Sequence, residues 1–543
     1  MLEQNERHVN LARFWVAFGV LSFSFFYYLT HAYATPVVGS WPQVQKDAGR
    51  SGYTADVLLP KTTGYTKLWQ VSLPPISSRV QPIIAQNMVF IPSNNGSVYA
   101  YVARQASVGS PAGGTQVWSY ASGSALVNSV AYHDKTGYPA GGVVFFGSTD
   151  GYIYAVQASN GSFIDKFATG GAIKTAPLIA NDKIIIGSSD GKMYSLQLSN
   201  LGQGLKFYEL WSRDVGTPIY DTAAYYNSRI FFGGMDSKGY ALNESDGSIA
   251  WSVQLNGQGF RDRWTVAGGG KVFFTPMLRG NTKDALQAGT QMLETGANPV
   301  IYDKDWATQR AVFLTYLQNN PQMRPLRILT DTTGAEPYLA PVLAATMGSQ
   351  SAHPQVVLYP DQGTTYANVV YRRGYPGDAG QWGATTNDGL YVGKLVLSTG
   401  DIEEIDKCVA GGGHWENCGV FKSPFISDES TALTRSASVI YLDVARTTVG
   451  LNLDTERTIG KVACYNESCE WHDYMENQKS PALTFTDWVP QGACTTGGGW
   501  RVSYCDVKSE VPGDGNDIKR PSPIVDNVMF ILHYDTLAAV EGL

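Results

Sequence analysis

One stretch decides the fold: Phe145-Phe146-Gly147-Ser148-Thr149-Asp150-Gly151-Tyr152-Ile153-Tyr154-Ala155. An apolar run meets an Asp-Gly pair and continues into a second run rich in aromatic and β-branched residues. Asp-Gly between such runs is a strong signal for a β-hairpin, because both residues accept a positive φ. The stretch therefore predicts two antiparallel strands joined by a tight turn.

The same pattern returns along the chain. Copies run over 89–100, 185–194, 231–242 and 530–538, each with a strand, a turn of Gly, Asp or Asn, and a second strand. A unit that recurs in this way indicates a repeat architecture. We therefore expect an all-β protein in which one kind of small sheet is repeated.

Composition agrees with this reading. Only 16% of the 543 residues are charged, 12% are aromatic, and there are 58 Gly and 26 Pro, a balance typical of many short strands joined by turns. The formal net charge of -7 comes without a basic run, which argues against a nucleic-acid partner and against a dedicated surface for anionic membranes.

A constant spacing marks a further strand ahead of each hairpin. The reference positions are the residues just before the turns: Phe90, Ile185, Phe232, Phe274, Tyr441 and Ile531. The residues eight positions earlier, which we expect to begin the innermost strands, are Pro82, Pro177, Ala224, Val266, Leu433 and Pro523. Two more units fit in outline through Asn128-Ser129-Val130 and Ala340-Pro341-Val342. The alignment predicts eight units, the fifth to seventh enlarged by loops.

The outer strands carry tryptophan. The run Ala241-Leu242-Asn243-Glu244-Ser245-Asp246-Gly247-Ser248-Ile249-Ala250-Trp251 resembles the Ala-x-Asp-x-x-Thr-Gly-x-x-x-Trp motif of the pyrroloquinoline quinone (PQQ) dehydrogenase propellers. Partial copies are 158–161 and 397–402, and Trp69, Trp118 and Trp211 end comparable strands. The resemblance covers most of Trp41 to Leu543. It implies a single PQQ-like β-propeller of about eight four-stranded blades, with each Trp docked between neighbours.

The two ends of the repeat region complement each other. The chain stops at 537–543, where an outer strand is due, and 66–71 is an outer strand that carries Trp69 but has no preceding partners. Joining the two completes the last blade and removes exposed sheet edges. We expect the N- and C-terminal strands to close the ring.

The first 34 residues resemble a targeting segment. Arg7 and Arg13 precede an apolar run over 14–29, and Ala32-Tyr33-Ala34 offers a signal-peptidase site. We expect an exported, periplasmic or extracellular protein that begins at Thr35. The alternative is an N-terminal membrane anchor that tethers the protein, because the run is at the short end of what spans a bilayer.

All cysteines lie in the last third of the chain: Cys408, Cys418, Cys464, Cys469, Cys494 and Cys505. In an exported chain they are expected to form disulfide bonds. Sequence order suggests the pairs 408 with 418, 464 with 469 and 494 with 505, and other pairings remain open. The propeller is expected over 35–543, with a disulfide-rich loop insertion at about 464–517.

The candidate site follows from the same alignment. Eleven positions before the reference residues stand Arg79, Lys174, Asp221, Arg263, Ser430 and Arg520. A ring of cations around the propeller axis suits an anionic ligand such as a quinone carboxylate, with Trp264 beside it as an aromatic platform. Asp221 is the candidate general base. The competing interpretations are solvated strand ends, a core tryptophan, and an Asp221 that pairs with Lys174 or Arg263.

Two functions remain. The first is a non-catalytic binding or assembly scaffold for a protein partner or a small anionic ligand. The second is the activity that the resemblance implies, a PQQ- and calcium-dependent dehydrogenase oxidising an alcohol or sugar. Such an enzyme also implies a Glu/Asn calcium set and vicinal cysteines, and no two cysteines are adjacent here. We expect the scaffold, without a metal site.

Overall fold

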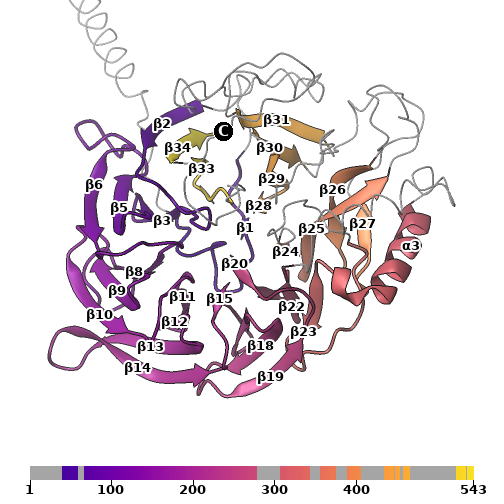
Figure 1. Cartoon of the computed structure of the whole chain (residues 1–543). Helices are drawn as coiled ribbons and strands as arrows, with labels where there is room; N and C mark the ends of the chain where they lie inside the picture. Colours follow the sequence, from indigo (N-terminus) through magenta and orange to yellow (C-terminus); the bar gives the residue numbers. More distant parts are fainter. Residues whose placement is uncertain are drawn as a thin grey trace, which may run out of the picture.

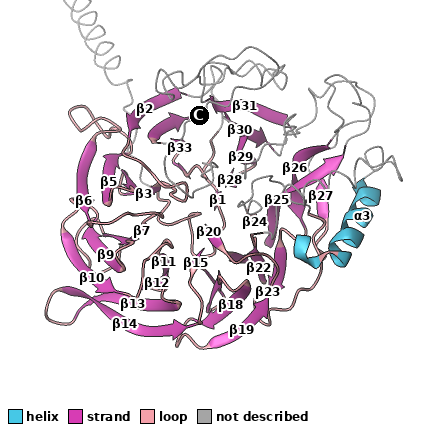
Figure 2. Cartoon of the chain, viewed as in Figure 1, coloured by secondary structure: helices cyan, strands magenta, loops and turns pink. Residues whose placement is uncertain are grey.

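The structure is a computed structural model that describes residues 39–58, 66–277, 306–342, 355–374, 388–404, 433–444, 447–452, 457–464, 521–533 and 535–542. Within these residues, eight radial sheets surround one axis (Figure 1). Strands and loops make up nearly all of the ring, as the expected all-β propeller requires (Figure 2). Each sheet is a blade, and neighbouring strands within a blade are antiparallel.

The first four blades are complete. Blade one contains β3 (Ile83–Ala85), β4 (Met88–Pro92), β5 (Ser97–Val102) and β6 (Gln116–Ala121). Blade two contains β7 (Ala131–His133), β8 (Val143–Gly147), β9 (Tyr152–Gln157) and β10 (Phe163–Ala168). Blade three contains β11 (Leu178–Ala180), β12 (Lys183–Gly187), β13 (Lys192–Asn200) and β14 (Leu205–Asp214). Blade four contains β16 (Ala224–Tyr226), β17 (Arg229–Gly233), β18 (Lys238–Asn243) and β19 (Ile249–Gln254).

The remaining blades carry the long connections. Blade five shows three strands in the described residues, β21 (Val266–Gly268), β22 (Lys271–Phe274) and β23 (Arg327–Thr330). Blade six contains β24 (Val357–Asp361), β25 (Thr364–Gly374), β26 (Asp388–Leu395) and β27 (Ile402–Glu404). Blade seven contains β28 (Leu433–Ser436), β29 (Val439–Val444), β30 (Thr447–Asn452) and β31 (Arg457–Cys464). Blade eight contains β32 (Ile524–Val525), β33 (Val528–His533), β34 (Thr536–Glu541) and β2 (Thr66–Ser72).

The predicted hairpin over 145–155 is confirmed. Phe145 pairs with Ala155 across β8 and β9, and Gly151 in the turn has a φ of +87°. The Asp150 carboxylate accepts the backbone N–H of Tyr152 at 3.0 Å and the Tyr154 hydroxyl at 2.6 Å. The Asp-Gly pair thus supplies both the left-handed backbone and a side-chain acceptor that ties the turn to the second strand.

The predicted inner strands are confirmed in seven of the blades and wrong in blade six. Pro82, Pro177 and Pro523 directly precede β3, β11 and β32. The innermost strand of blade six is β24, which begins at Val357, not at Ala340-Pro341-Val342. Ala340 and Val342 are buried among the apolar residues of blades five and six. An apolar stretch has the same sequence pattern whether it begins a strand or packs as a buried connection. In addition, Pro341 has no backbone N–H to donate to a neighbouring strand.

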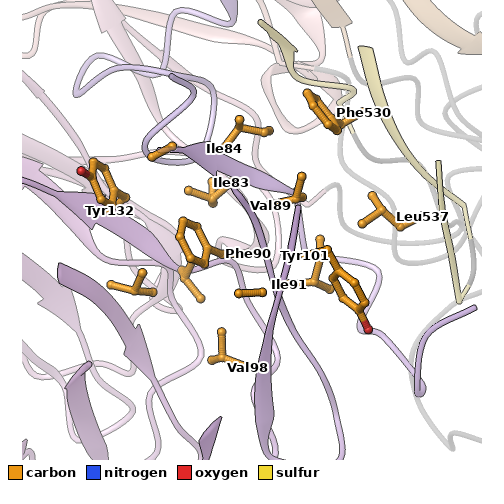
Figure 3. Packing of buried hydrophobic residues seen from close by; sticks show 14 of the residues in the cluster. Ile83, Ile84, Val89, Phe90, Ile91, Val98, Tyr101, Tyr132, Phe530 and Leu537 are labelled. Atoms are coloured by element: carbon orange, nitrogen blue, oxygen red, sulfur yellow. The ribbon is translucent and has the colours of Figure 1, made fainter. Parts of the chain in front are cut away.

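The predicted closure is confirmed. In β2 and β34, Thr66 pairs with Glu541 and Gln70 pairs with Ala538. The buried cluster of blade one continues into blade eight. Figure 3 shows Phe530 and Leu537 of blade eight, which belong to this cluster. The last blade therefore consists of both ends of the repeat region, and its core is shared with the first.

Tryptophans dock neighbouring blades as the motif implies. The indole N–H groups donate to backbone carbonyls of the next blade: Trp69 to Ala103 at 2.7 Å, Trp118 to Ala158 at 2.8 Å, Trp211 to Glu244 at 3.0 Å and Trp251 to Asp331 at 2.9 Å. Each indole also lies against a glycine of that blade: Gly114, Gly161, Gly247 and Gly334. Between blades five and six Tyr338 takes this place, because its hydroxyl donates to the Leu397 carbonyl at 2.5 Å and its ring lies against Gly400.

One helix was not anticipated in the loops of the fifth unit. It is α3 (Trp306–Asn319), followed by the short turn η1 (Pro321–Met323), and it lies at the outside of the ring beside blade six (Figure 2). Trp306 donates to the Ile402 carbonyl at 3.0 Å, and Phe313 and Leu317 are buried. Among the described residues, no helix has the length and apolar character needed to cross a membrane.

Several predictions lie outside the described residues. These are the targeting segment 1–34, Arg520, most of the insertion at about 464–517, and the cysteines Cys408, Cys418, Cys469, Cys494 and Cys505. Cys464 is the last residue of β31. The disulfide pairs therefore stay predictions.

Candidate functional site on the axis of the ring

A described segment ahead of the first blade, residues 39–58, lies inside the ring. Residues 39–58, called the belt below, run past the innermost strands in turn and include β1 (Tyr53–Thr54), which lies near the centre of Figure 1. Backbone N–H groups of the blades donate to belt carbonyls: Tyr132 to Pro42 at 2.7 Å, Tyr225 to Ala48 at 2.7 Å, Ala267 to Gly49 at 2.9 Å, Leu358 to Ser51 at 2.9 Å and Arg435 to Gly52 at 2.9 Å.

The other three blades also contact the belt. Trp41 exchanges two backbone hydrogen bonds with Ile84 of β3. The Gln43 side-chain amide makes the equivalent pair with Ile179 of β11. At blade eight, Asp526 accepts the Gly39 N–H through its carboxylate and donates its own N–H to Asp56. One segment thus makes a full circuit and contacts all eight blades.

Arg50 lies at the heart of this arrangement. Its side chain is 0% exposed. Nε donates to the Ala223 carbonyl at 3.0 Å, and Nη2 to the Pro177 carbonyl at 3.4 Å, while Nη1 reaches the Val44 carbonyl at 2.9 Å and Gln43 Oε1 at 3.4 Å. Burial lowers the pKa of Arg50 to about 9, so the guanidinium stays charged at neutral pH. Blades three and four are joined to the belt through this cation.

Asp221 is the residue that the sequence predicts as the general base. It is 2% exposed, and its Oδ2 accepts the Gly233 N–H at 2.9 Å and the Thr265 hydroxyl at 2.6 Å. Burial raises the pKa of Asp221 to about 6, although both hydrogen bonds and the charge of Arg50 act in the opposite direction. The carboxylate is therefore part of the wall of the ring.

Three of the predicted site residues lie on adjoining strands. Asp221 is in β15 (Tyr220–Thr222), which pairs in parallel with β20 (Arg261–Trp264), and β20 contains Arg263 and Trp264. The indole Nε1 of Trp264 is buried and has no hydrogen-bond partner among the described residues. Its ring packs against the apolar cluster of blades five and six.

Lys174 joins this group. Its Nζ lies 4.9 Å from the centre of the Tyr220 ring, a distance at which a cation is attracted to an aromatic face. Its carbonyl accepts the Asn128 amide at 3.0 Å, and the same amide contacts the Thr222 hydroxyl at 3.4 Å. Arg79 lies in the connection ahead of β3 in blade one. Lys174, Asp221, Arg263 and Trp264 thus lie on adjoining inner segments of blades three to five, with the Asp221 carboxylate bonded into the wall and the Trp264 ring packed against the core.

A calcium-held quinone would need several oxygen ligands close to the axis. Calcium takes six to eight oxygen ligands, several of them carboxylates, and no group of three or more His, Cys, Asp or Glu side chains forms in the part of the chain that the structure describes. One oxygen of the Asp221 carboxylate already accepts two hydrogen bonds from the wall.

Sequence reasoning missed the belt and Arg50. The only signal was an arginine between Gly49 and Gly52 in a segment without strand periodicity. A peptide carbonyl that receives a hydrogen bond has no signature in the sequence, because every residue supplies one. The circuit could therefore not be anticipated from residue types.

The repeat can now be compared with known proteins. Residues 103–203, which include β6 to β13, match the family described as outer membrane protein assembly factor BamB. The chain is a β-propeller, and its repeats over 103–203 are similar to those of this family. No curated protein sequence matches the chain.

Solved structures that are similar to this β-propeller come from two functional groups. BamB from Moraxella catarrhalis is 12% identical with a TM-score of 0.44, over 88% of this chain and 99% of that one. Quinohemoprotein alcohol dehydrogenase ADHIIG from Pseudomonas putida HK5 is 14% identical with a TM-score of 0.43, over 79% and 72%. A europium-containing methanol dehydrogenase is 12% identical with a TM-score of 0.47, over 78% and 85%. Likenesses at this level say nothing about what the chain binds.

Proposed function

We propose that this protein is a non-catalytic binding or assembly scaffold for a protein partner. The proposal rests on the two charged residues at the propeller axis. Arg50 is 0% and Asp221 is 2% exposed, and both side chains are hydrogen-bonded within the ring. A general base must come within hydrogen-bond reach of the proton that it abstracts. The Asp221 carboxylate is held to Gly233 and Thr265 instead.

The outside of the ring supports a protein partner. Large apolar side chains are exposed on the outermost strands of four consecutive blades: Val117 on β6 at 46%, Phe163 on β10 at 49%, Leu210 on β14 at 43% and Ile249 on β19 at 46%. They lie one per blade along the outer strands, so a protein partner that covers these strands would bury them. The matching family is itself described as an assembly factor. A protein surface suits these residues better than a small anion does.

The proposed location is the cell envelope or the exterior. It rests on the targeting pattern of residues 1–34. N-terminal sequencing of the protein from its native envelope fraction is expected to start at Thr35. A chain that keeps residues 1–34 and fractionates with membranes would instead indicate the N-terminal anchor and membrane tethering.

A cofactor titration separates the scaffold from the enzyme. The purified protein and its Arg263→Ala variant are incubated with PQQ and calcium, followed by absorbance, and assayed for dye-linked oxidation of methanol, ethanol and glucose. We expect no saturable binding and no turnover from either. Saturable binding with turnover, both lost in Arg263→Ala, would overturn the scaffold in favour of a PQQ- and calcium-dependent dehydrogenase.

Crosslinking in the native host tests the partner. Phe163→Asp and Leu210→Asp place a charge on the exposed apolar side chains, whereas Ser119→Asp and Ser212→Asp place it on exposed polar positions of outer strands. A discrete crosslinked species is expected with the wild-type protein and the serine variants, and its loss is expected with the apolar ones. Equal crosslinking of all four variants would show that the partner does not use this surface.

A further inference from the structure

The ring holds the belt through backbone hydrogen bonds, as a receptor holds a bound peptide. The belt itself contains turns, in which the Lys46 and Gly52 N–H groups donate to the Gln43 and Gln45 carbonyls. Five innermost strands donate a backbone N–H to a belt carbonyl at 2.7 to 2.9 Å, and β3 exchanges two such bonds with Trp41. At β11 the Gln43 side-chain amide imitates a peptide group, since its Oε1 accepts the Ile179 N–H and its Nε2 donates to the Ile179 carbonyl. Main-chain bonds of this kind give affinity for a segment with little regard to its side chains.

The belt backbone is strained. Gln45, Lys46 and Arg50 have φ values of +55°, +76° and +62°, a region that residues with a Cβ adopt at a cost. Strained conformations persist only where the surroundings over-determine them, and ligand clamps are among the places where they gather. The ring thus imposes the conformation of the belt.

Two neighbouring residues decide which sequence fits. The Arg50 guanidinium is bonded to three backbone carbonyls of the belt and of blades three and four, and it faces the charge of Asp221. A Cβ on Gly49 would lie 2.5 Å from the carbonyl oxygen of Ala267, which is closer than real Cβ contacts allow. Only a glycine followed by a basic side chain satisfies both neighbours.

We infer that the innermost strands form a peptide-binding site, that the belt occupies this site in cis, and that Gly49-Arg50 is its specificity-determining pair. The ligand class is a peptide segment that turns around the axis and in which arginine follows glycine. This inference does not depend on the scaffold function, because it concerns the axis of the ring and not its outer strands.

The test uses the full chain. A single protease recognition sequence is inserted between Leu58 and Thr66, and the protein is cut only after it has folded, so that the belt is then joined to the ring by non-covalent contacts alone. A labelled synthetic peptide of residues 39–58 is the probe. Matched peptides carry Arg50→Ala, Gly49→Ala, or Val57→Ser as a control at a position that is 44% exposed.

We expect the cut fragment to co-elute with the ring, and the wild-type and Val57→Ser peptides to exchange into it. The Arg50→Ala and Gly49→Ala peptides should bind more than about tenfold more weakly, because each loses or obstructs a buried contact. Equal binding of all four peptides, immediate release of the fragment from a folded ring, failure of the wild-type peptide to enter, or unfolding on cleavage would each overturn the inference.

Discussion

At the scale of single residues, Asp221 shows how side chains that are distant in sequence set the property of one group. Thr265 and Gly233 donate to its carboxylate, and Arg50 faces it from the belt. Burial outweighs these contacts and raises the pKa of Asp221 to about 6 from an ordinary value of 3.8. The folded protein therefore holds this proton more tightly than the unfolded chain does.

The raised pKa of Asp221 makes the free energy of unfolding depend on pH. Between pH 6 and 4 the folded state binds the Asp221 proton and the unfolded state does not, so this group adds stability as the pH falls. A shift of about two units corresponds to about 3 kcal/mol. Urea denaturation at pH 7.5 and at pH 4.5 gives the change in the free energy of unfolding between these two pH values. In the wild type this change includes the contribution of Asp221, and in Asp221→Asn it should lack it, a difference of up to about 3 kcal/mol in favour of the wild type at pH 4.5.

The matched control for Asp221 is Glu209→Gln, which removes an exposed carboxylate from β14. It is expected to keep the wild-type pH profile. If Asp221→Asn and Glu209→Gln show the same profile, burial of Asp221 does not govern the titration.

At the scale of elements, the blades are joined by indole rings that lie on glycine. Gly247 has a φ of +68°, and a Cβ there would lie 2.5 Å from Cε3 of Trp211. Glycine therefore supplies both the left-handed backbone and the space for the ring. The tyrosine at 338 shows that the dock needs a flat ring with one donor, and not tryptophan as such.

Two glycines separate these contributions. Gly216 has a φ of +74° and nothing within 4 Å of its added Cβ, so Gly216→Ala should lose only about 1 to 2 kcal/mol, from the backbone conformation alone. Gly247→Ala should pay that cost and about 1 to 3 kcal/mol more, because it crowds the Trp211 ring. Urea unfolding of both variants measures the difference. Equal destabilisation would mean that this dock contributes little to the stability of the ring.

At the scale of the whole molecule, β34 connects the two ends of the repeat region. It pairs with β2 on one side and β33 on the other, and Leu537, Ala538, Ala539 and Val540 are each 0% exposed. Without β34, the edges of β2 and β33 would be open. Closure is thus a property of the complete chain and not of any one blade.

Removal of residues 536–543 tests closure. The loss of stability should be as large as the free energy of unfolding of a typical domain, about 5 to 15 kcal/mol. We therefore expect the truncated protein to aggregate and to show no cooperative thermal transition. Removal of Gly542 and Leu543 alone keeps β34 and should leave the midpoint near that of the wild type. Size-exclusion chromatography and circular dichroism report both results. A monomeric, cooperatively unfolding protein without β34 would contradict the role of closure.

The sequence by itself determined the blades, their number and their closure. These features depend on local chemistry that repeats: Asp-Gly turns that accept a positive φ, strands at a constant spacing, and Trp-bearing outer strands that lack a partner at one end. The displaced inner strand of blade six and the helix α3 escaped this reasoning, because both follow long connections that interrupt the spacing.

Only the tertiary structure decided what fills the axis. The alignment placed Lys174, Asp221 and Arg263 in one ring, and in the structure they lie with Trp264 on adjoining inner segments of blades three to five. The contacts at the axis join residues up to several hundred positions apart. They include the hydrogen bonds of the belt, the carbonyls around Arg50 and the donors to Asp221. The physical reason is that peptide N–H and C=O groups make most of these contacts, and every residue carries them whatever its side chain.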